Sequence, residues 1–366
     1  MPIYMDIHRV PGLEAIDAAK AHQQDMAIQH EYHCKCMTYW IDEPRGVVFC
    51  LIEATDRSSV EEMHRNSHGL VPNRIIDVNN DVVETFLGRI HDPDGALITD
   101  KGFKVFSDSA FRILLITDML DPVLLRHAMG AENAEALLNR QNENIRKALS
   151  AHGGREVEHA GSSFIISFTS AAGAMACALE IQKNCPASDR ILTGFKMAIN
   201  AGEPVAKSDE LFGDCIQLAK YLCRITSCDR IIISSAVAEL LARDNFRENK
   251  NNIAMASSGD EALLEALFAR LEENWQDPDF TVNRICQKMS MSKSRLYRKT
   301  IALWGLSPNQ LLREFRLDKA KELLKKRTYN VTQATFDSGF SSPSYFTKCF
   351  KKKFGLLPAA YQNSPQ

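Results

Sequence analysis

Long apolar stretches are missing from this 366-residue sequence. No run of about 18 apolar residues occurs, so a membrane span is not expected. The opening MPIYMDIHRV also lacks the basic patch and apolar run of a secretion signal. The ten cysteines follow no disulfide-scaffold rhythm, which in a chain of this length suits reduced thiols in the core. These absences predict a cytoplasmic protein.

The chain also has little net charge, -2 in total, but its charged residues are unevenly distributed. From Ala262 onward, about 18 lysines and arginines stand against about 9 acids, which leaves about 26 against 37 in the preceding part. The length allows two or three domains. An acidic body with a folded basic segment at its C-terminal side favours a polyanionic partner such as nucleic acid.

Residues 1–95 are predicted to form the first domain. IYMDIHRV alternates apolar and polar residues like a strand, residues 13–31 have the period of a helix, and CKCMTYWI and VVFCLIEA read as a hairpin across the turn DEPRG. Ser59 and Glu62 have the spacing of a capping box that opens a second helix, and RIIDV supplies a last strand. The order β-α-β-β-α-β predicts a ferredoxin-like fold.

Two histidines of this first domain are spaced for metal binding. His64 and His68 lie four residues apart in SSVEEMHRNSHG, so both imidazoles share one helix face and can chelate one ion. His8, on an outer strand face, and the pair Cys34 and Cys36 add candidate ligands. The competing interpretation is a solvated polar helix face, and the sequence does not show that these side chains converge.

Residues 108–245 are predicted to form a second α/β domain. Strands are expected at FRILLIT, SFIISF, FKMAIN and RIIISS, with a long helix at AEALLNRQNENIRKALSAHGG. The polar stretch RENKNNIAMASSGD that follows is predicted to be a linker.

Residues 260–366 are predicted to be all helical, with two helix-turn-helix units joined by a helix of about 19 residues, or about 28 Å. That length suits two recognition helices in major-groove segments roughly 34 Å apart. Side chains opposite the predicted core are expected to meet base edges; they are Ser294, Tyr297, Arg298, Ser344, Thr347 and Lys348. Flanking cations are expected to hold phosphates; they are Lys293, Arg295, Lys299 and Lys351 to Lys353.

The aromatic and lysine alternation of this segment would also fit a solvated amphipathic helix without a partner. The stretch GFSSPSYFTKCFKKKFGLLPAAY, however, resembles the signature of the AraC/XylS family of bacterial transcription regulators, and the likeness covers residues 262 to 362. It implies that double-stranded DNA is the partner. The chain departs from the family at Cys286, Thr300 and Thr335, which lie off the proposed reading face.

The middle segment resembles the catalytic domain of class III nucleotide cyclases over residues 109 to 241. The likeness implies two metal-binding aspartates and an Asn/Arg pair supplied by the other subunit. Asp118 matches the first aspartate, but Ser162 stands at the second, and Gln217 and Tyr221 replace the Asn/Arg pair. Losing a cation at developing charge should cost about 3–4 kcal/mol of barrier. Glu158, at the base-selecting position, would suit guanine.

The first domain resembles a bacterial family of small ferredoxin-like domains described as nickel-binding, on PIYMDIHRVPG, YW, VFCLIEA and MHRNSHGL. The resemblance implies His8, His64 and His68 as ligands, with Asp6 and Cys36 as further candidates. Nickel, zinc and copper all accept imidazole, so the ligands predict a divalent transition metal without choosing one.

The whole sequence therefore predicts a multidomain α+β and all-α protein that regulates transcription. The first two domains are expected to sense a metal, a nucleotide or another small ligand, and to set the oligomeric state, as a homodimer. One alternative is a guanylate-type cyclase fused to a DNA-binding domain. Another is a metal-buffering or interaction protein whose helix-turn-helix units contact a protein.

Overall fold

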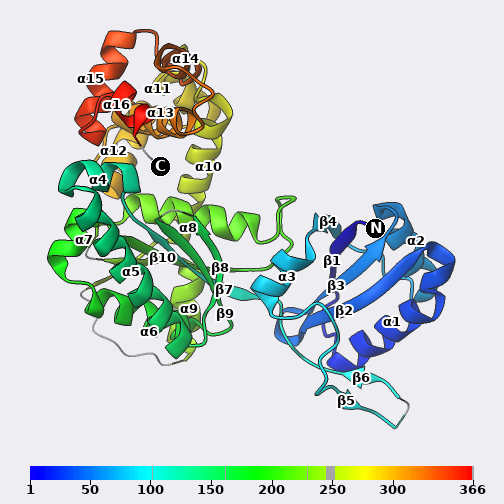
Figure 1. The fold of residues 1–366 in the computed structure, drawn as a ribbon. Helices are drawn as coiled ribbons and strands as arrows, with labels where there is room; N and C mark the ends of the chain where they lie inside the picture. Colours follow the sequence, from blue (N-terminus) through cyan, green and yellow to red (C-terminus); the bar gives the residue numbers. More distant parts are fainter. Residues whose placement is uncertain (101, 161, 229, 245–251, 365–366) are drawn as a thin grey trace.

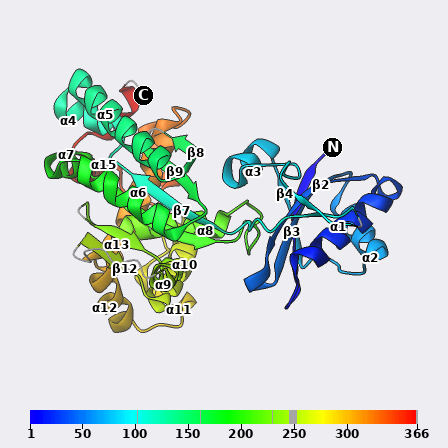
Figure 2. The same cartoon turned by 90° about the horizontal axis from the view of Figure 1, so that it is seen from below.

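The computed structural model describes residues 1–100, 102–160, 162–228, 230–244 and 252–364. Figure 1 shows three units: an N-terminal unit on one side, a middle unit, and a helical C-terminal unit stacked on the middle one. Figure 2 shows that the N-terminal unit meets the others at only one side. Among the described residues, no helix combines the length and apolarity that crossing a bilayer requires. The predicted multidomain α+β and all-α class is confirmed.

The N-terminal unit is a four-stranded antiparallel sheet in the order β2-β3-β1-β4 with both main helices on one face. This is the predicted ferredoxin-like fold. Its elements are β1 (Ile3–Arg9), α1 (Ala15–Ile28), β2 (Cys34–Asp42), β3 (Val47–Ala54), α2 (Arg57–Ser67), β4 (Arg74–Val78), α3 (Asn80–Leu87), β5 (Leu97–Ile98) and β6 (Lys104–Val105).

Two local predictions for this unit were wrong. Helix α2 begins one turn earlier than the capping-box spacing predicts, because the Asp56 side chain accepts a hydrogen bond from the Ser59 backbone N–H and acts as the N-cap. The face of β1 that carries His8 is not an outer face, since α1 and α2 cover it and leave the side chain 5% exposed. Both faces of β1 are therefore buried.

The middle unit is a six-stranded sheet in the order β12-β11-β10-β7-β9-β8. The four strands that come first in the chain, β7 to β10, repeat the arrangement of the N-terminal sheet. In both sheets the first of the four strands lies between the third and the fourth. Its elements are β7 (Arg112–Asp118), α4 (Pro122–Met129), α5 (Ala131–Ala151), β8 (Arg155–Ala160), β9 (Ser163–Phe168), α6 (Ala171–Asn184), α7 (Ala187–Thr193), β10 (Lys196–Gly202), α8 (Gly213–Ile225), β11 (Ile231–Ile233), α9 (Ser235–Arg243) and β12 (Ile253–Met255).

Strand β12 corrects the prediction that 247–260 is only a linker. Ile253 to Met255 pair in parallel with β11 and extend the middle sheet at its edge. Residues 247–251 of the predicted linker lie outside the described residues. The sheet thus runs beyond the boundary expected at residue 245.

The C-terminal unit consists of seven helices among the described residues and contains both predicted helix-turn-helix units. Its elements are α10 (Ser258–Asn274), α11 (Val282–Lys288), α12 (Lys293–Trp304), α13 (Pro308–Lys325), α14 (Val331–Asp337), α15 (Pro343–Phe354) and α16 (Pro358–Asn363). The predicted connecting helix is α13, which opens with Ser307 and Gln310 in a capping box. Phe340, Phe346 and Phe350 form the apolar stripe of the second unit, as predicted.

One apolar core connects the three units. Met5 and Ile7 of β1, Phe86 of α3, residues of α8 and Phe268 of α10 belong to the same cluster of buried side chains. Phe86 stacks on Phe212 just before α8, with ring centroids 4.8 Å apart. On the other side of α8, the rings of Tyr221 and Phe268 stack at 4.3 Å. Helix α8 therefore joins the N-terminal unit to the helical unit through buried rings.

A second contact ties the middle unit to the second helix-turn-helix unit. Val123 and Leu124 of α4 pack in the cluster that contains Phe350 of α15. The Tyr361 hydroxyl donates a hydrogen bond of 3.0 Å to the buried Asp121 carboxylate. The helical unit is thus anchored to the middle unit at both of its ends.

Replacing Phe268 by alanine tests this anchoring. The ring is 1% exposed and contacts Tyr221, Trp304 and Phe315. Phe268→Ala should therefore lower the free energy of unfolding by about 3–5 kcal/mol in urea titrations. Phe336→Ala, at a ring that is 49% exposed, is the matched control and should change it by less than about 1 kcal/mol. Equal losses in the two variants would contradict the proposed anchoring role.

Candidate functional site

The first predicted recognition helix, α12, presents a polar face to solvent. Ser294, Tyr297 and Arg298 are exposed, while Leu296 and Thr300 on the opposite face are buried. The Ser292 side chain accepts a hydrogen bond from the Arg295 backbone N–H and caps the helix. The three candidate residues thus share one accessible face at the N-terminal half of the helix.

The second predicted recognition helix, α15, is built in the same way. Ser344 and Lys348 are exposed and Thr347 is half-buried, whereas Phe346 and Phe350 face the core. The turn before it needs glycine at Gly339, where φ is +77° and a Cβ atom would lie 2.3 Å from the Trp275 carbonyl oxygen. Tyr345, 50% exposed on α15, is a candidate contact that the spacing argument missed.

Two of the predicted phosphate-holding lysines are engaged in ion pairs inside the protein. Lys299 Nζ lies 2.9 Å from Asp260, and Lys353 Nζ lies 2.7 Å from Asp318. For the predicted phosphate contacts to form, a DNA phosphate would have to displace Asp260 and Asp318 from these lysines. Lys293, Arg295 and Lys351 are exposed, as that role requires.

The metal candidates of the N-terminal unit converge between β1 and α2. His64 Nε2 lies 2.9 Å from Asp6 Oδ2, and His64 Nδ1 lies 3.1 Å from Asp25 Oδ2. His68 Nε2 lies 3.2 Å from Asp25 Oδ1. The His64 side chain has no exposed surface, so the alternative of a solvated polar face is excluded.

His8 completes the group and supplies ring nitrogens that have no other role. Its ring lies edge-on to that of His64, with centroids 4.8 Å apart. Its Nε2 lies 3.3 Å from Asp6, yet neither ring nitrogen forms a hydrogen bond with a described residue. A buried imidazole without hydrogen bonds is costly unless another partner satisfies it. The geometry therefore fits a metal ligand at His8.

Two overlapping sets of donors result from this convergence. One ligand atom each from Asp6, His8, Cys50 and His64 lies within 4.8 Å of the others, and the same holds for Asp25, His64 and His68. Imidazole, carboxylate and thiol donors of this kind suit a divalent transition metal. Cys36, a predicted further candidate, instead has its Sγ 3.8 Å from Met63 Sδ and does not join either set.

Burial and charge oppose each other at this cluster. Burial disfavours a charged His64 ring, but Asp6 and Asp25 outweigh it and raise the His64 pKa to about 10. Burial likewise favours the neutral form of Asp6 and Asp25, yet the neighbouring histidines hold the pKa of both carboxyl groups well below its usual value. In the absence of an ion, a histidine proton balances the two buried carboxylates.

The cluster is reached from solvent through a mostly apolar recess of about 240 Å³. His8 and His68 line it together with Leu13, Val48 and Leu70. These two histidines are therefore the ones that an entering ion would meet first.

The cyclase-like positions of the middle unit lie on β7, on β8, immediately before β9 and on α8. Asp118 is exposed at the end of β7 and accepts a hydrogen bond of 2.9 Å from Ser163 Oγ. Ser162 is buried and donates to the Met119 carbonyl oxygen. Glu158 is exposed on β8, on the far side of β9 from Asp118. Gly161, part of the predicted pattern, lies outside the described residues.

The positions of the missing Asn/Arg pair are closed off by the chain itself. Tyr221, where the family has its arginine, is 5% exposed because Phe268 of α10 covers its ring. Gln217 is half-buried next to it. A second subunit has no access to Tyr221 in this conformation.

Two parts of the chain match known protein families. Residues 285–364 match the helix-turn-helix domain family, and residues 4–78 match the family described as nickel responsive protein SCO4226-like. The C-terminal unit thus contains a helix-turn-helix domain. More narrowly, it is of the AraC type, and the N-terminal unit is SCO4226-like, as both resemblances predicted.

Individual relatives match parts of the chain. Histidine kinase P4 of Formosa agariphila is 39% identical over 107 residues, which are 29% of this chain and 8% of the kinase. The HTH-type transcriptional activator RhaS of Escherichia coli strain SE11 is 28% identical over 133 residues, which are 36% of this chain. The chain spans about 45% of the length of RhaS. The guanylyl cyclase Cya2 aligns at 18% identity and a TM-score of 0.31, over 36% of this chain and 77% of Cya2.

Replacing His64 tests the charge balance of the metal cluster. His64→Gln removes the cation between Asp6 and Asp25 and leaves two buried carboxylates facing each other. In metal-free buffer at pH 7 it should lower the free energy of unfolding by about 3–5 kcal/mol in urea titrations. His33→Gln, at a surface turn, should be neutral, and adding Asp6→Asn to His64→Gln should recover part of the loss. A neutral His64→Gln would refute the ion-pair account.

Proposed function

We propose that this chain is a DNA-binding transcription regulator of AraC type, in which the N-terminal unit senses a divalent transition metal and alters DNA binding. The observation that carries the proposal is the pair of recognition helices, α12 and α15, each with a buried apolar face and an accessible polar face. The family match over residues 285–364 supports double-stranded DNA as the partner. Such a protein works in the cytoplasm, and we propose that it acts as a homodimer.

Within this proposal, base edges are read by the six residues that the sequence singled out. Arg298 has the geometry for a bidentate contact with guanine, and Ser294, Ser344, Thr347 and Lys348 can reach neighbouring bases or phosphates. Lys293, Arg295 and Lys351 hold the phosphate backbone. Tyr297 of α12 and Tyr345 of α15 supply apolar contact to base methyl groups or sugars.

The metal proposal rests on His8, His64 and His68, with Asp6, Asp25 and Cys50 beside them. The match with the nickel responsive family favours nickel. When bound, the ion supplies charge that replaces the His64 proton between two buried carboxylates. Asp6 and His8 alternate along β1 with Met5 and Ile7, which belong to the core shared by the three units. A shift of β1 at the cluster therefore also moves side chains of that core.

We further propose that the middle unit is not a cyclase. Ser162 has a hydroxyl where a metal would need a carboxylate, and its hydrogen bond to Met119 uses that hydroxyl. Tyr221 offers no cation and is covered by Phe268. The unit serves instead as the connection between the sensing and the DNA-binding units.

Two substitutions distinguish base reading from phosphate holding. On a duplex that the wild-type protein selects from a random-sequence pool, Arg298→Ala should weaken binding by about 1–3 kcal/mol and relax the preference at one base pair. Lys351→Ala should weaken binding to all sequences and reduce the slope of log affinity against log salt by about 1. Fluorescence anisotropy measures both effects, with Lys183→Ala on α6 as the control. If the affinity for DNA does not change with salt concentration, the phosphate contacts are absent, and the alternative of a protein partner is favoured.

A nickel titration tests the sensing proposal. Adding Ni²⁺ to the metal-stripped protein should change its dissociation constant for the same duplex at least tenfold, which is about 1.4 kcal/mol of coupling. His8→Gln, which removes a proposed ligand whose ring nitrogens form no hydrogen bond with a described residue, should remove the response while its affinity for DNA in the absence of metal stays near that of the wild type. His30→Gln, on the surface of the same unit, is the matched control. An unchanged affinity in the presence of Ni²⁺, Zn²⁺ and Cu²⁺ would end the proposal of metal sensing.

A further inference from the structure

The two recognition helices pack in different apolar cores, which meet along α13. Phe315, in the first half of α13, belongs to the cluster of buried side chains that contains Leu296 of α12. Leu317, two residues later, belongs to the cluster that contains Phe350 of α15. Arg316 lies between them, where α13 passes from one core to the other. The angle between the two recognition helices is therefore not fixed by one shared core.

The Arg316 guanidinium joins the first helix-turn-helix unit to α13 through main-chain carbonyl oxygens. Its Nε–H donates a hydrogen bond of 2.9 Å to Trp275, and its Nη2 group donates to Asp277 and Phe280 at 2.6 Å and 3.2 Å. All three carbonyls belong to the segment that connects α10 with α11. A planar fork with several donors suits such a set of acceptors, whereas a lysine presents its donors from one atom.

The second unit meets the same hydrogen bonds at Gly339, in the turn between α14 and α15. A Cβ atom at Gly339 would lie 2.3 Å from the Trp275 carbonyl oxygen and 2.8 Å from Arg316 Nε. The Gly339 backbone therefore packs directly on the hydrogen bond between Arg316 and Trp275. We call these three residues the junction. It brings together the segment before α11, the connecting helix α13 and the turn before the second recognition helix.

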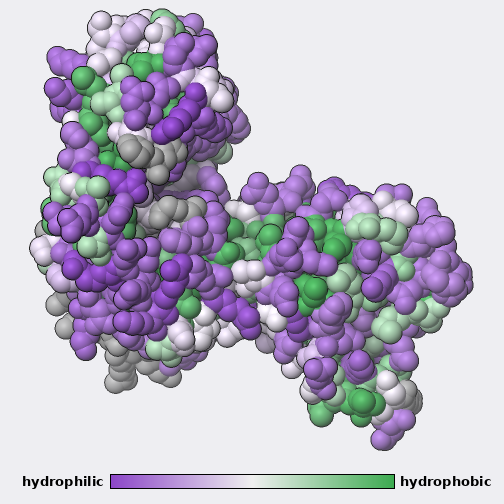
Figure 3. Space-filling view, viewed as in Figure 1, coloured by the Kyte–Doolittle hydropathy of each residue, from purple (hydrophilic) through white to green (hydrophobic). Residues whose placement is uncertain are grey.

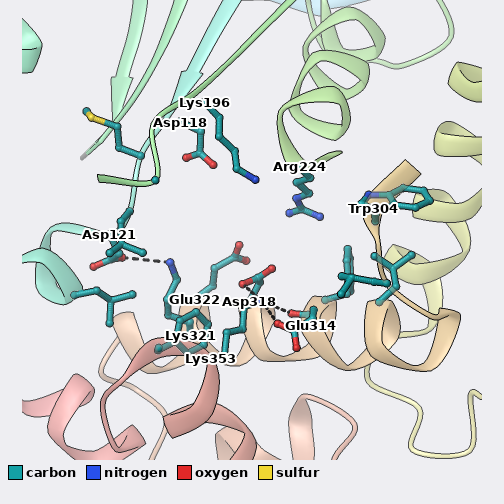
Figure 4. A pocket seen from close by; sticks show the side chains of 18 of the residues that line it. Asp118, Asp121, Lys196, Arg224, Trp304, Glu314, Asp318, Lys321, Glu322 and Lys353 are labelled. Atoms are coloured by element: carbon teal, nitrogen blue, oxygen red, sulfur yellow. Dashed lines mark hydrogen bonds and ion pairs between the residues drawn. The ribbon is translucent and has the colours of Figure 1, made fainter. Parts of the chain in front are cut away.

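The other side of α13 is held to the second recognition helix. Glu314 and Asp318 lie two residues before and after Arg316, and hence on the opposite side of the helix. Lys353, in the last turn of α15, lies 3.1 Å from Glu314 and 2.7 Å from Asp318, and Figure 4 shows it between α13 and these carboxylates' neighbours. Helix α13 is thus fixed to α15 on one side and to the α10–α11 segment on the other.

We propose that Arg316 is a positioning residue for DNA binding, which sets the distance and angle between α12 and α15 by holding Trp275 against Gly339. The two helices then fit major-groove segments at one preferred separation. Since B-DNA makes one turn in about 10–10.5 base pairs, one inserted base pair rotates the second segment by roughly 35°. This inference rests on the proposed function, because it requires that both helices bind DNA.

Duplexes with altered spacing test the proposal on the full chain. The starting duplex is the one that the wild-type protein selects from a random-sequence pool, and hydroxyl-radical footprinting identifies its two protected segments. One base pair is then inserted or deleted between them, and anisotropy gives each dissociation constant. The wild type should bind the altered duplexes at least about thirtyfold more weakly than the selected one. Arg316→Gln should reduce that ratio to about threefold or less and keep the base preference within each segment.

Three further variants separate positioning from charge and from stability. Arg316→Lys keeps the charge but not the fork, so it should lose the spacing preference as Arg316→Gln does. Gly339→Ala disturbs the junction from the second unit and should lower the same ratio. Arg270→Gln removes a guanidinium that pairs with Glu273 on the surface of α10, and it should keep the wild-type ratio. Each variant must melt cooperatively above the assay temperature, which circular dichroism measures.

The outcomes distinguish this inference from the regulator proposal. If the Arg316 variants bind all duplexes more weakly by one common factor, or if Arg316→Lys restores the wild-type ratio, Arg316 does not position the helices. A wild-type protein that binds the selected duplex but ignores the spacing also overturns the inference, while the regulator proposal stands. If the wild-type protein binds no duplex, the regulator proposal fails, and the inference fails with it.

Discussion

Burial of both faces of a few central elements is the constraint on which this structure depends. Helix α8 is covered by its own sheet, by Phe212 and Phe86 on one side and by Phe268 on the other, so three units share one apolar core. Linked domains with small polar interfaces move freely by default. Here buried ring stacks join the units, and the ion pairs Arg9–Glu203 and Arg74–Asp209 add to the contact between the N-terminal and middle units. Figure 3 shows a mostly hydrophilic face with several apolar spots, one of them at the tip of the N-terminal unit formed by β5 and β6, where Leu97 and Ile98 are exposed.

The sequence predicted the helices and strands better than it predicted which of them contact each other. Alternation in IYMDIHRV placed Asp6 and His8 on one face, and the spacing of His64 and His68 placed both on one side of a helix, because these periods are local. Cys50 and Asp25 were missed for a different reason. Cys50 meets Asp6 through the register of β1 on β3, in which the two residues are opposite each other, and register is not local information.

The same distinction explains the other misses. Strand β12 has only three residues in a polar stretch, too few for a period to show, and it exists because β11 offers an edge to pair with. From the sequence, Lys299 and Lys353 were predicted to be free to bind phosphates. In the fold, Lys299 pairs with Asp260 of α10 and Lys353 pairs with Asp318 of α13. The sequence shows that Tyr221 stands where the cyclase family has an arginine. That α10 covers Tyr221 is visible only in the tertiary structure. In the recognition helices, by contrast, the buried and the exposed face are set by one helical period, and the predicted core residues Leu296, Phe346 and Phe350 are buried.

Strand β1 connects the chemistry of the N-terminal unit with its packing. Its side chains point alternately to the metal cluster and to the core that all three units share, and a strand cannot move one set without the other. A close-packed core does not deform continuously. A small displacement at Asp6 and His8 is therefore either prevented by the core or accompanied by a change of packing at Met5 and Ile7. Two discrete packings with different affinities for an ion are what a sensor requires.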